Sequence, residues 1–533
     1  MLSSLSAGVP SARLAPRDAA KYSRPVLGQP VVYLLAALLA FAVLWLLCPQ
    51  EYVVSDPGAY SKRAYRIAED GRFGAGHIFD QRLAVTLPTA LVYRTVGVNI
   101  LTTNFVVLLS ALLIMLTVWL ALPDTKSRAI GAALCLTSIP LFSSSLVLFP
   151  DLIATAFMAL SAHLLFSRRK VVERRGDPAL VSVAAVALLF IAFLAKESAY
   201  WVLPLWVWAV VIDLRQSDRA TLLRRFYVPA LATAIGLAAV YLAFSYATWG
   251  DPLIRFKVIQ AMTGQHVWSW GEDSAELLAR LTVGPPRFFY REYGALILLL
   301  AALGGSLATG PMRPWSFYAA SCLLLFWFGS SSFTSYQPLP LKPRQALPIL
   351  PAIYILAACS ASRIRIPFGS WQRARSLVPV LLILTYAGWR FVAHYESRRE
   401  KVFPEQVAMS HVRNQIRSDP ESDYLLVCSD SSSVGSLSFF FGYEYPDNLE
   451  VVYVEDLSPE QVHGRAAYVY VNHGRSSYRW DKYGKRHYDA EIQSLTFAPV
   501  YQEKDVLLLR SDREDLLLEL IAMSARRRSE DES

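Results

Sequence analysis

Long apolar stretches separated by short polar loops recur along residues 31–395. Most of them have about 17 to 22 residues, the length that an α-helix needs to cross the hydrocarbon core of a bilayer. Hydrophobic residues make up 54% of the 533 residues, and charged residues make up only 18%, against roughly 25% in soluble domains. A single soluble core is therefore excluded, and the sequence predicts a polytopic α-helical membrane protein.

We expect about eleven membrane-spanning helices. Their predicted bounds are 31–48, 101–121, 129–149, 151–167, 179–195, 198–213, 227–247, 293–309, 317–333, 345–360 and 377–394. Loops rich in Lys and Arg belong on the cytoplasmic side of a membrane. The loops of this kind are 125–128, 168–175, 215–225 and 362–375. Because these loops explain the formal net charge of +9, nucleic-acid binding is not indicated, and the charge serves topology instead.

Three regions follow from this pattern. Residues 1–30 form a basic cytoplasmic leader, residues 31–395 form the transmembrane domain, and residues 396–533 form a small α/β domain on the outer side. The strands expected in that domain are 424–429, 449–457 and 466–472. The chain has no Asn-x-Ser/Thr motif, which is typical of a bacterial source, so we expect a multi-pass protein of the bacterial inner membrane.

The first outer loop, residues 49–100, carries two amphipathic helices. Asp56 and Pro57 are a helix start, since Asp is a favoured cap and Pro a favoured first residue. Gly71 is a typical helix stop. One apolar stripe of this helix comprises Tyr60, Ala64, Ile67 and Ala68. A second helix is expected at about 82–96, so the loop lays two helices on the membrane surface with Asp56 at their root.

Six charged residues stand at the outer ends of predicted spans. They are Asp56, Asp151, Lys196, Glu197, Lys342 and Arg344. Ionisable groups near the hydrocarbon boundary are costly, so they are functional candidates by default. Plain structural roles stay open for each one. Asp151 would cap a helix, Lys196 and Glu197 would form an interfacial ion pair, and Arg344 would extend to lipid headgroups.

Together these residues resemble the GT-C superfamily of glycosyltransferases, in particular the protein O-mannosyltransferase and aminoarabinose transferase branch. The resemblance covers residues 30–395. Its motifs are D-x-x-x-Y-x-x-x-A-x-x-I-x-x-x-G from Asp56 to Gly71, G-x-N at 97–99, FPD at 149–151, AKES at 195–198 and P-R-x-x-L-P-x-x-P at 343–351. Two positions depart from the family pattern. Pro57 stands where many relatives have a second acidic residue, and Gln345 stands where they often have Tyr.

The resemblance implies an integral membrane enzyme of the cell envelope that moves a hexose or pentose from a polyprenyl-phosphate donor to an acceptor hydroxyl. Transfer would occur on the outer side of the membrane and invert the anomeric carbon. The acceptor would be a glycan, a lipid or a protein, and the sequence does not distinguish these.

The resemblance also implies roles for individual residues. Asp56 would be the general base, and Asp151 would orient the acceptor or hold a divalent cation together with Asp56. No other cofactor is expected. The donor phosphate would be bound by Lys342, Arg344 and Lys196. Supporting roles would fall to Glu197, which would pair with or fix Lys196, and to Arg63 and Arg82, which would contact phosphate or lipid headgroups.

Two alternatives remain open from the residues. A secondary transporter of a sugar or lipid-linked sugar would be expected to show paired repeats and broken helices at the middle of the membrane. An O-antigen ligase or polymerase would use a pyrophosphate-linked donor rather than a monophosphate. The charges at span ends and the outer α/β domain favour a glycosyltransferase over a transporter.

Overall fold

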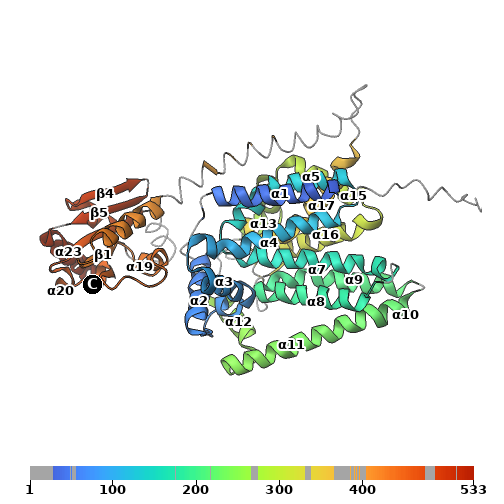
Figure 1. Cartoon of the computed structure of the whole chain (residues 1–533), viewed down its shortest axis with the longest axis horizontal. Helices are drawn as coiled ribbons and strands as arrows, with labels where there is room; N and C mark the ends of the chain where they lie inside the picture. The colour runs from blue at the N-terminus through green and yellow to red at the C-terminus, as the bar shows by residue number, and fades with distance from the viewer. Residues whose placement is uncertain are drawn as a thin grey trace, which may run out of the picture.

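The protein consists of a helical bundle followed by a domain built on a β-sheet, and the two lie next to each other in the computed structural model (Figure 1). The structure describes residues 28–48, 50, 56–173, 176–216, 218–265, 274–330, 336, 338–364, 385, 389, 392, 395, 396, 404–473, 487–503, 505–511 and 513–532. The leader and most of the span predicted at 377–394 lie outside these residues.

The bundle comprises the elements up to residue 363. Its α-helices are α1 (Gly28–Leu47), α2 (Asp56–Asp70), α3 (Leu83–Val96), α4 (Ile100–Ala121), α5 (Thr125–Leu136), α6 (Ile139–Ser145), α7 (Pro150–Glu173), α8 (Pro178–Ala195), α9 (Leu203–Leu214), α10 (Arg219–Leu222), α11 (Val228–Trp249), α12 (Ile254–Gln265), α13 (Ser274–Leu281), α14 (Gly284–Tyr293), α15 (Ala295–Ser306), α16 (Arg313–Phe328) and α17 (Leu350–Arg363). Short 3₁₀ or π turns join them at η2 (Ile78–Gln81), η3 (Glu197–Val202), η4 (Leu223–Tyr227), η5 (Gly310–Met312) and η6 (Pro343–Ile349).

The multi-pass architecture is confirmed, whereas the count of eleven spans is not. Among the described residues, six helices are long and apolar enough to cross a membrane, and a seventh is obtained if the bent pair α14–α15 is one span. The six are 100–121, 150–173, 178–195, 197–214, 219–249 and 343–363, and each coincides with a span predicted from the sequence.

Two of the other predicted spans are interrupted. The stretch 129–149 is divided into α5 and α6 because Ser138 leaves the helix in an extended conformation and caps α6 through its side chain. The stretch 293–309 is reduced to α15, which bends by 108° from α14 at Gly294, whose φ is +80°. Glycine tolerates this left-handed φ without steric cost. Local caps and turns therefore break runs whose apolar composition alone indicates a continuous helix.

The two helices predicted in the 49–100 loop are confirmed as α2 and α3. Gly71 ends α2 with φ +66°, and its amide donates to the Ile67 carbonyl at 3.1 Å. Tyr60 and Ala64 are fully buried, because α2 packs on α3 through its apolar stripe. Three further helices, α12, α13 and α14, lie between the long helix α11 and α15.

One end of the bundle gathers the first residues of α2 and α7 and the last residues of α8, and α10 lies at the other end (Figure 1). Helix α7 illustrates the separation, since 24 residues at 1.5 Å each span about 36 Å. Asp151 lies at its first turn and Arg168 near its last turns, where Arg168 Nε donates to Asp213 Oδ2 at 2.5 Å. The sequence-predicted outer and basic faces therefore correspond to opposite ends of the bundle.

The C-terminal domain has a five-stranded sheet in the order β2-β1-β3-β5-β4. Its strands are β1 (Tyr424–Cys428), β2 (Leu449–Tyr453), β3 (Ala466–Asn472), β4 (Ala498–Glu503) and β5 (Val506–Ser511). Its helices and turns are the segment 404–418, α19 (Ser431–Leu437), η7 (Ser438–Phe441), η8 (Val454–Asp456), α20 (Pro459–Val462), α22 (Asp489–Ser494) and α23 (Glu514–Glu532). Strand β1 pairs in parallel with β2 and β3, and β5 pairs antiparallel with β3 and β4. The three predicted strands are confirmed, and β4 and β5 were not predicted.

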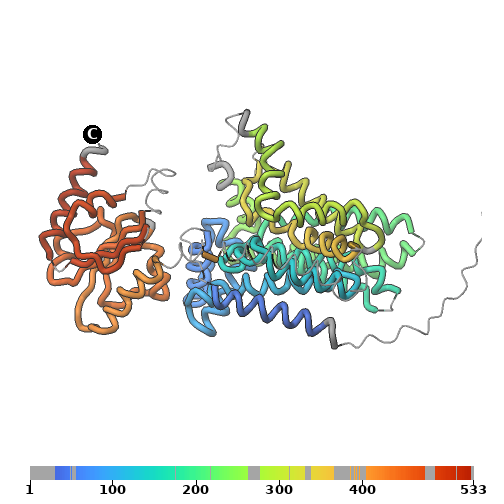
Figure 2. Tube along the Cα trace, turned by 90° about the horizontal axis from the view of Figure 1, so that it is seen from above, coloured from blue at the N-terminus to red at the C-terminus, as the bar shows by residue number. Residues whose placement is uncertain are grey.

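The sheet domain contacts the same end of the bundle that carries α2 and α3 (Figure 2). Tyr65 of α2 donates from its hydroxyl to Glu444 Oε1 at 2.5 Å, and its ring centroid lies 5.2 Å from that of Tyr443. Gln406 donates from its side-chain amide to the Gln50 carbonyl at 2.9 Å. These polar and aromatic contacts join the sheet domain to α2 and to Gln50.

Candidate active site

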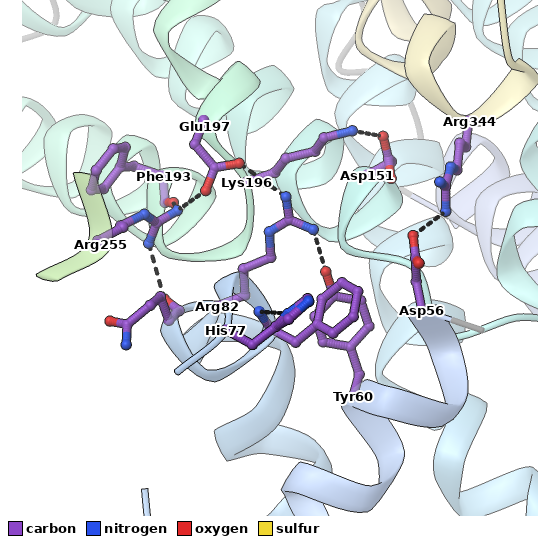
Figure 3. A network of polar contacts seen from close by, with 12 residues as sticks. Asp56, Tyr60, His77, Arg82, Asp151, Phe193, Lys196, Glu197, Arg255 and Arg344 are labelled. Carbon is purple, nitrogen blue, oxygen red and sulfur yellow. Dashed lines mark hydrogen bonds and ion pairs between the residues drawn. The ribbon is translucent and has the colours of Figure 1, made fainter. Parts of the chain in front are cut away.

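The predicted base Asp56 and the predicted phosphate ligand Arg344 are ion-paired. Arg344 Nη1 lies 3.1 Å from Asp56 Oδ2, and the two side chains are 24% and 38% exposed (Figure 3). The guanidinium also stacks on Phe149, with Cζ 4.3 Å from the ring centroid. Asp56 begins α2 and Arg344 lies in η6, so the 49–100 loop and the segment 343–363 meet at this pair. Both groups remain reachable by a ligand.

Lys196 and Asp151 form a second, more buried pair. Lys196 Nζ donates to Asp151 Oδ1 (Figure 3), and their side chains are 17% and 4% exposed. The sequence left open a pair between Lys196 and its neighbour Glu197, and the structure corrects this. Lys196 has an extended backbone, with φ −157° and ψ 146°, so successive side chains point in different directions. The Lys196 ammonium group pairs with Asp151 at the first turn of α7 instead.

Glu197 binds two arginines and so joins three elements. Its Oε2 accepts from Arg82 Nη2 at 3.0 Å, and its Oε1 accepts from Arg255 Nη2 at 2.8 Å. Arg82 also donates to the buried Tyr60 hydroxyl. Burial raises the pKa of Tyr60 well above its usual value, so the phenol stays neutral. The loop around α2 and α3 is thereby tied to the end of α8.

Arg255 was not singled out from the sequence. Its side chain is 1% exposed, and it donates to the carbonyls of Gln81 at 3.1 Å and Phe193 at 2.6 Å as well as to Glu197. Its Cζ lies 4.3 Å from the centre of the Phe193 ring. The sequence signal that could have identified Arg255 is its place in the apolar stretch LIRF, residues 253–256. A cation that is buried among apolar residues needs a charged or polar partner.

Arg63 has a structural contact in the surface loop. Its Nε lies 2.5 Å from Asp80 Oδ1, and its Nη1 donates to the Ala59 carbonyl at 3.2 Å. Asp80 in turn accepts from the His77 backbone amide at 3.0 Å and closes a capping box around η2. Arg63 therefore ties α2 to η2, and its predicted contact with phosphate or headgroups stays a prediction.

Lys342 is half-buried and directly precedes η6, two residues before Arg344. The chain leading to it is held by Arg280, whose side chain donates to the Leu339 carbonyl at 2.7 and 3.0 Å. Arg280 also reaches the carbonyls of Phe326 at 3.1 Å and Trp327 at 3.3 Å. This buried guanidinium fixes the path between α16 and η6 and so the position from which Arg344 extends.

The three ion-pair groups lie side by side. Lys196 and Asp151 stand between the Arg82–Glu197 contact and the Arg344–Asp56 contact (Figure 3). With Arg255 included, these ion pairs contain four cationic side chains and three carboxylates, so their net charge is +1. Such a surplus of positive charge suits an anionic ligand.

Asp56 and Asp151 were named from the sequence as possible ligands of a divalent cation. No group of three or more His, Cys, Asp or Glu side chains in the described part of the chain is arranged to hold a metal ion. Each of the two carboxylates instead accepts a cationic side chain.

The bundle, the helices α2 and α3 and the charged cluster at one end define a multi-pass helical membrane protein. No protein-family model and no curated protein matches the sequence. Among solved structures, the chain is similar to ArnT from Cupriavidus metallidurans in the apo state, with TM-score 0.57 and 15% identity over 91% of this chain and 98% of that chain. The structure of the same ArnT bound to undecaprenyl phosphate aligns with TM-score 0.56 and 13% identity, over 90% of this chain and 97% of that chain. At these identities the likeness establishes the fold alone. As far as the fold is concerned, it confirms the resemblance to the aminoarabinose transferase branch.

Proposed function

We propose that the protein is a membrane glycosyltransferase that moves a sugar from a polyprenyl-phosphate donor to an acceptor hydroxyl. The observation that carries the proposal is the reachable Asp56–Arg344 pair, 3.1 Å apart, at the end of a bundle whose fold is that of ArnT. One of the ArnT structures holds undecaprenyl phosphate, which supports a lipid monophosphate as the common part of the donor.

Asp56 would act as the general base. As the acceptor oxygen attacks the anomeric carbon, its proton passes to a carboxylate oxygen of Asp56, and the bond from the anomeric carbon to the phosphate oxygen breaks. The electron pair of that bond leaves with the lipid phosphate. A single displacement of this kind inverts the anomeric carbon. The side chain is 38% exposed, which supports access by an acceptor.

Arg344, Lys342 and Lys196 would bind the donor phosphate and offset the charge that builds up on its leaving oxygen. In the structure Arg344 Nη1 donates to Asp56 Oδ2. A phosphate that takes over the guanidinium would release the carboxylate, so donor binding and base activation would occur together. Asp151 would hold Lys196 in place. Because the Asp151 side chain is only 4% exposed, we assign it to positioning Lys196 rather than to binding the acceptor.

We further propose that residues 1–30 are cytoplasmic, that residues 31–395 form the catalytic membrane domain, and that residues 396–533 lie outside with the active site. The membrane would be the bacterial inner membrane. The basic loops and the charged cluster lie at opposite ends of the bundle, which supports this orientation by the positive-inside rule.

Transfer by the purified protein tests the proposal. A polyprenyl monophosphate sugar should be consumed in the presence of envelope lipids and glycans as acceptors, with a new glycosylated product seen by mass spectrometry. The matching pyrophosphate-linked donor should not react, and the reverse result would favour the ligase or polymerase alternative. Movement of labelled sugar across sealed vesicles without any product would favour the transporter.

A further inference from the structure

A cavity of about 590 Å³ lies where the sheet domain meets the bundle, apart from the charged cluster. Its lining comes from the start of α4, the segment 404–418 and the η7 turn. The lining residues are Val98, Asn99, Ile100, Gln406, Arg413, Ile416, Arg417, Phe439, Phe440, Phe441, Gly442 and Pro446. None of them is acidic, and two are arginines, so the cavity has a net positive wall.

Arg413 and Arg417 supply that charge. They are four residues apart in one helical segment, so their side chains lie on the same face. Both are exposed, and neither guanidinium has a hydrogen-bond or ion-pair partner among the residues that the structure describes. By contrast, Arg63, Arg82, Arg255 and Arg344 near the charged cluster all pair with carboxylates. Two adjacent unpaired guanidinium groups suit bidentate binding of a phosphate.

The part of the lining that comes from η7 is apolar. Phe439 and Phe440 lie edge to face with ring centroids 5.7 Å apart. The turn after them has two successive residues in the left-handed region, Gly442 with φ +75° and Tyr443 with φ +71°. A non-glycine residue in this region is strained and persists only where its surroundings hold it. Here Tyr443 is held by its ring contact with Tyr65 of α2.

The level of the cavity relative to the membrane follows from α4. Ile100 is both a lining residue and the first residue of α4, a helix long and apolar enough to cross a membrane. The end of a span lies at the interface where lipid headgroups are found. A cavity there presents its arginines at the depth of headgroup phosphates and its phenylalanines to the apolar part of a lipid.

We propose that this cavity binds the phosphate-bearing headgroup of an anionic membrane lipid, with Arg413 and Arg417 on the phosphate and Phe439–Phe441 against the glycerol and the first acyl carbons. Occupation would brace the sheet domain against the start of α4. This inference is independent of the proposed transfer reaction, because the cavity and the charged cluster share no residues.

Native mass spectrometry of the full-length protein in an uncharged detergent tests the site with three probes. Dioctanoyl phosphatidylglycerol should bind, whereas dioctanoyl phosphatidylcholine, whose phosphate charge is balanced by choline, and inorganic phosphate should bind at least about tenfold more weakly. The double variant Arg413→Gln/Arg417→Gln should bind phosphatidylglycerol about 10- to 100-fold more weakly than the wild type. The matched control Arg526→Gln/Arg528→Gln removes the same charge from α23, outside the cavity, and should bind like the wild type.

A photoreactive short-chain phosphatidylglycerol gives a second measurement that needs no variant to fold. It should label the peptide that contains Phe439–Phe441 in the wild-type protein, and excess unlabelled phosphatidylglycerol should compete. Undiminished binding by the Arg413/Arg417 variant, equal binding of phosphatidylcholine, binding of inorganic phosphate as tight as that of the lipid, or labelling elsewhere only would each overturn the proposal. Because none of these readouts involves sugar transfer, an inactive transferase would leave the result interpretable.

Discussion

Replacing Asp56 with Asn is expected to remove sugar transfer while leaving the protein folded. The amide keeps the shape of the carboxylate and an oxygen for Arg344, but it is a far weaker proton acceptor. Loss of a general base lowers the rate by about 100- to 10,000-fold, which corresponds to roughly 2.7 to 5.4 kcal/mol in the activation free energy. The cost in stability is expected to be at most about 1 kcal/mol, because partly exposed ion pairs contribute little and these side chains are 24% and 38% exposed.

Asp151 offers a matched comparison within the same cluster. Its side chain is 4% exposed, and that of its partner Lys196 is 17% exposed. Asp151→Asn removes one charge of this pair and leaves an uncompensated buried ammonium group, which costs about 3–5 kcal/mol in the free energy of unfolding. The double variant Asp151→Asn/Lys196→Met removes both charges and should recover much of that stability, since replacing a whole buried pair is often close to neutral.

The assay combines two readouts on the same purified variants. Thermal unfolding in detergent should rank Asp56→Asn near the wild type, Asp151→Asn lowest and the double variant between them. Single-turnover transfer from a polyprenyl-phosphate sugar should show the loss of rate in Asp56→Asn at saturating donor. Transfer by Asp56→Asn at close to the wild-type rate would refute the role of base and redirect attention to Asp151 or Glu197. An equally large loss of stability in Asp56→Asn and Asp151→Asn would refute the expectation that the more buried Asp151–Lys196 pair contributes more to stability than the Asp56–Arg344 pair.

Three further results are expected. Arg344→Lys should lower donor affinity by about tenfold at unchanged thermal stability, because an ammonium group cannot replace a bidentate guanidinium; unchanged affinity in a donor titration would assign Arg344 to lipid headgroups instead. Arg280→Lys should destabilise the protein by about 1–3 kcal/mol in thermal unfolding, since one ammonium group cannot serve three separated backbone carbonyls; wild-type stability would contradict this. Single cysteines at the exposed positions Thr95 and Ser418 should react with an impermeant thiol reagent on intact cells, and one at exposed Gln216 should react only after permeabilisation. The five native cysteines are buried and should give little background, and the opposite labelling pattern would reverse the proposed orientation.

Features that depend on neighbouring residues in the chain were predictable from the sequence. The six helices able to cross a membrane coincide with predicted spans, because length and apolarity alone determine whether a segment can enter a bilayer as a helix. Helix α2 was equally predictable, since its Asp56–Pro57 start, its apolar stripe and Gly71 at its end are all local signals. The order of charged residues at span ends also indicated that they share one face.

Features that depend on distant contacts were decided by the tertiary structure. Asp56 meets Arg344 across 288 positions of the chain, and Glu197 meets Arg82 across 115; the sequence offered Lys196 and Glu197 as partners because they are adjacent. Arg255 looked like an ordinary loop cation until its burial was known.

The edge strand β4 was missed for a related reason. Its side chains are mostly exposed, so it lacks the apolar signal by which the buried strands β1 and β3 were recognised. Composition and periodicity report how each segment meets the lipid or a core. The choice of partner for each charge depends on which span ends the packing of the bundle brings together, and that information is spread over the whole chain.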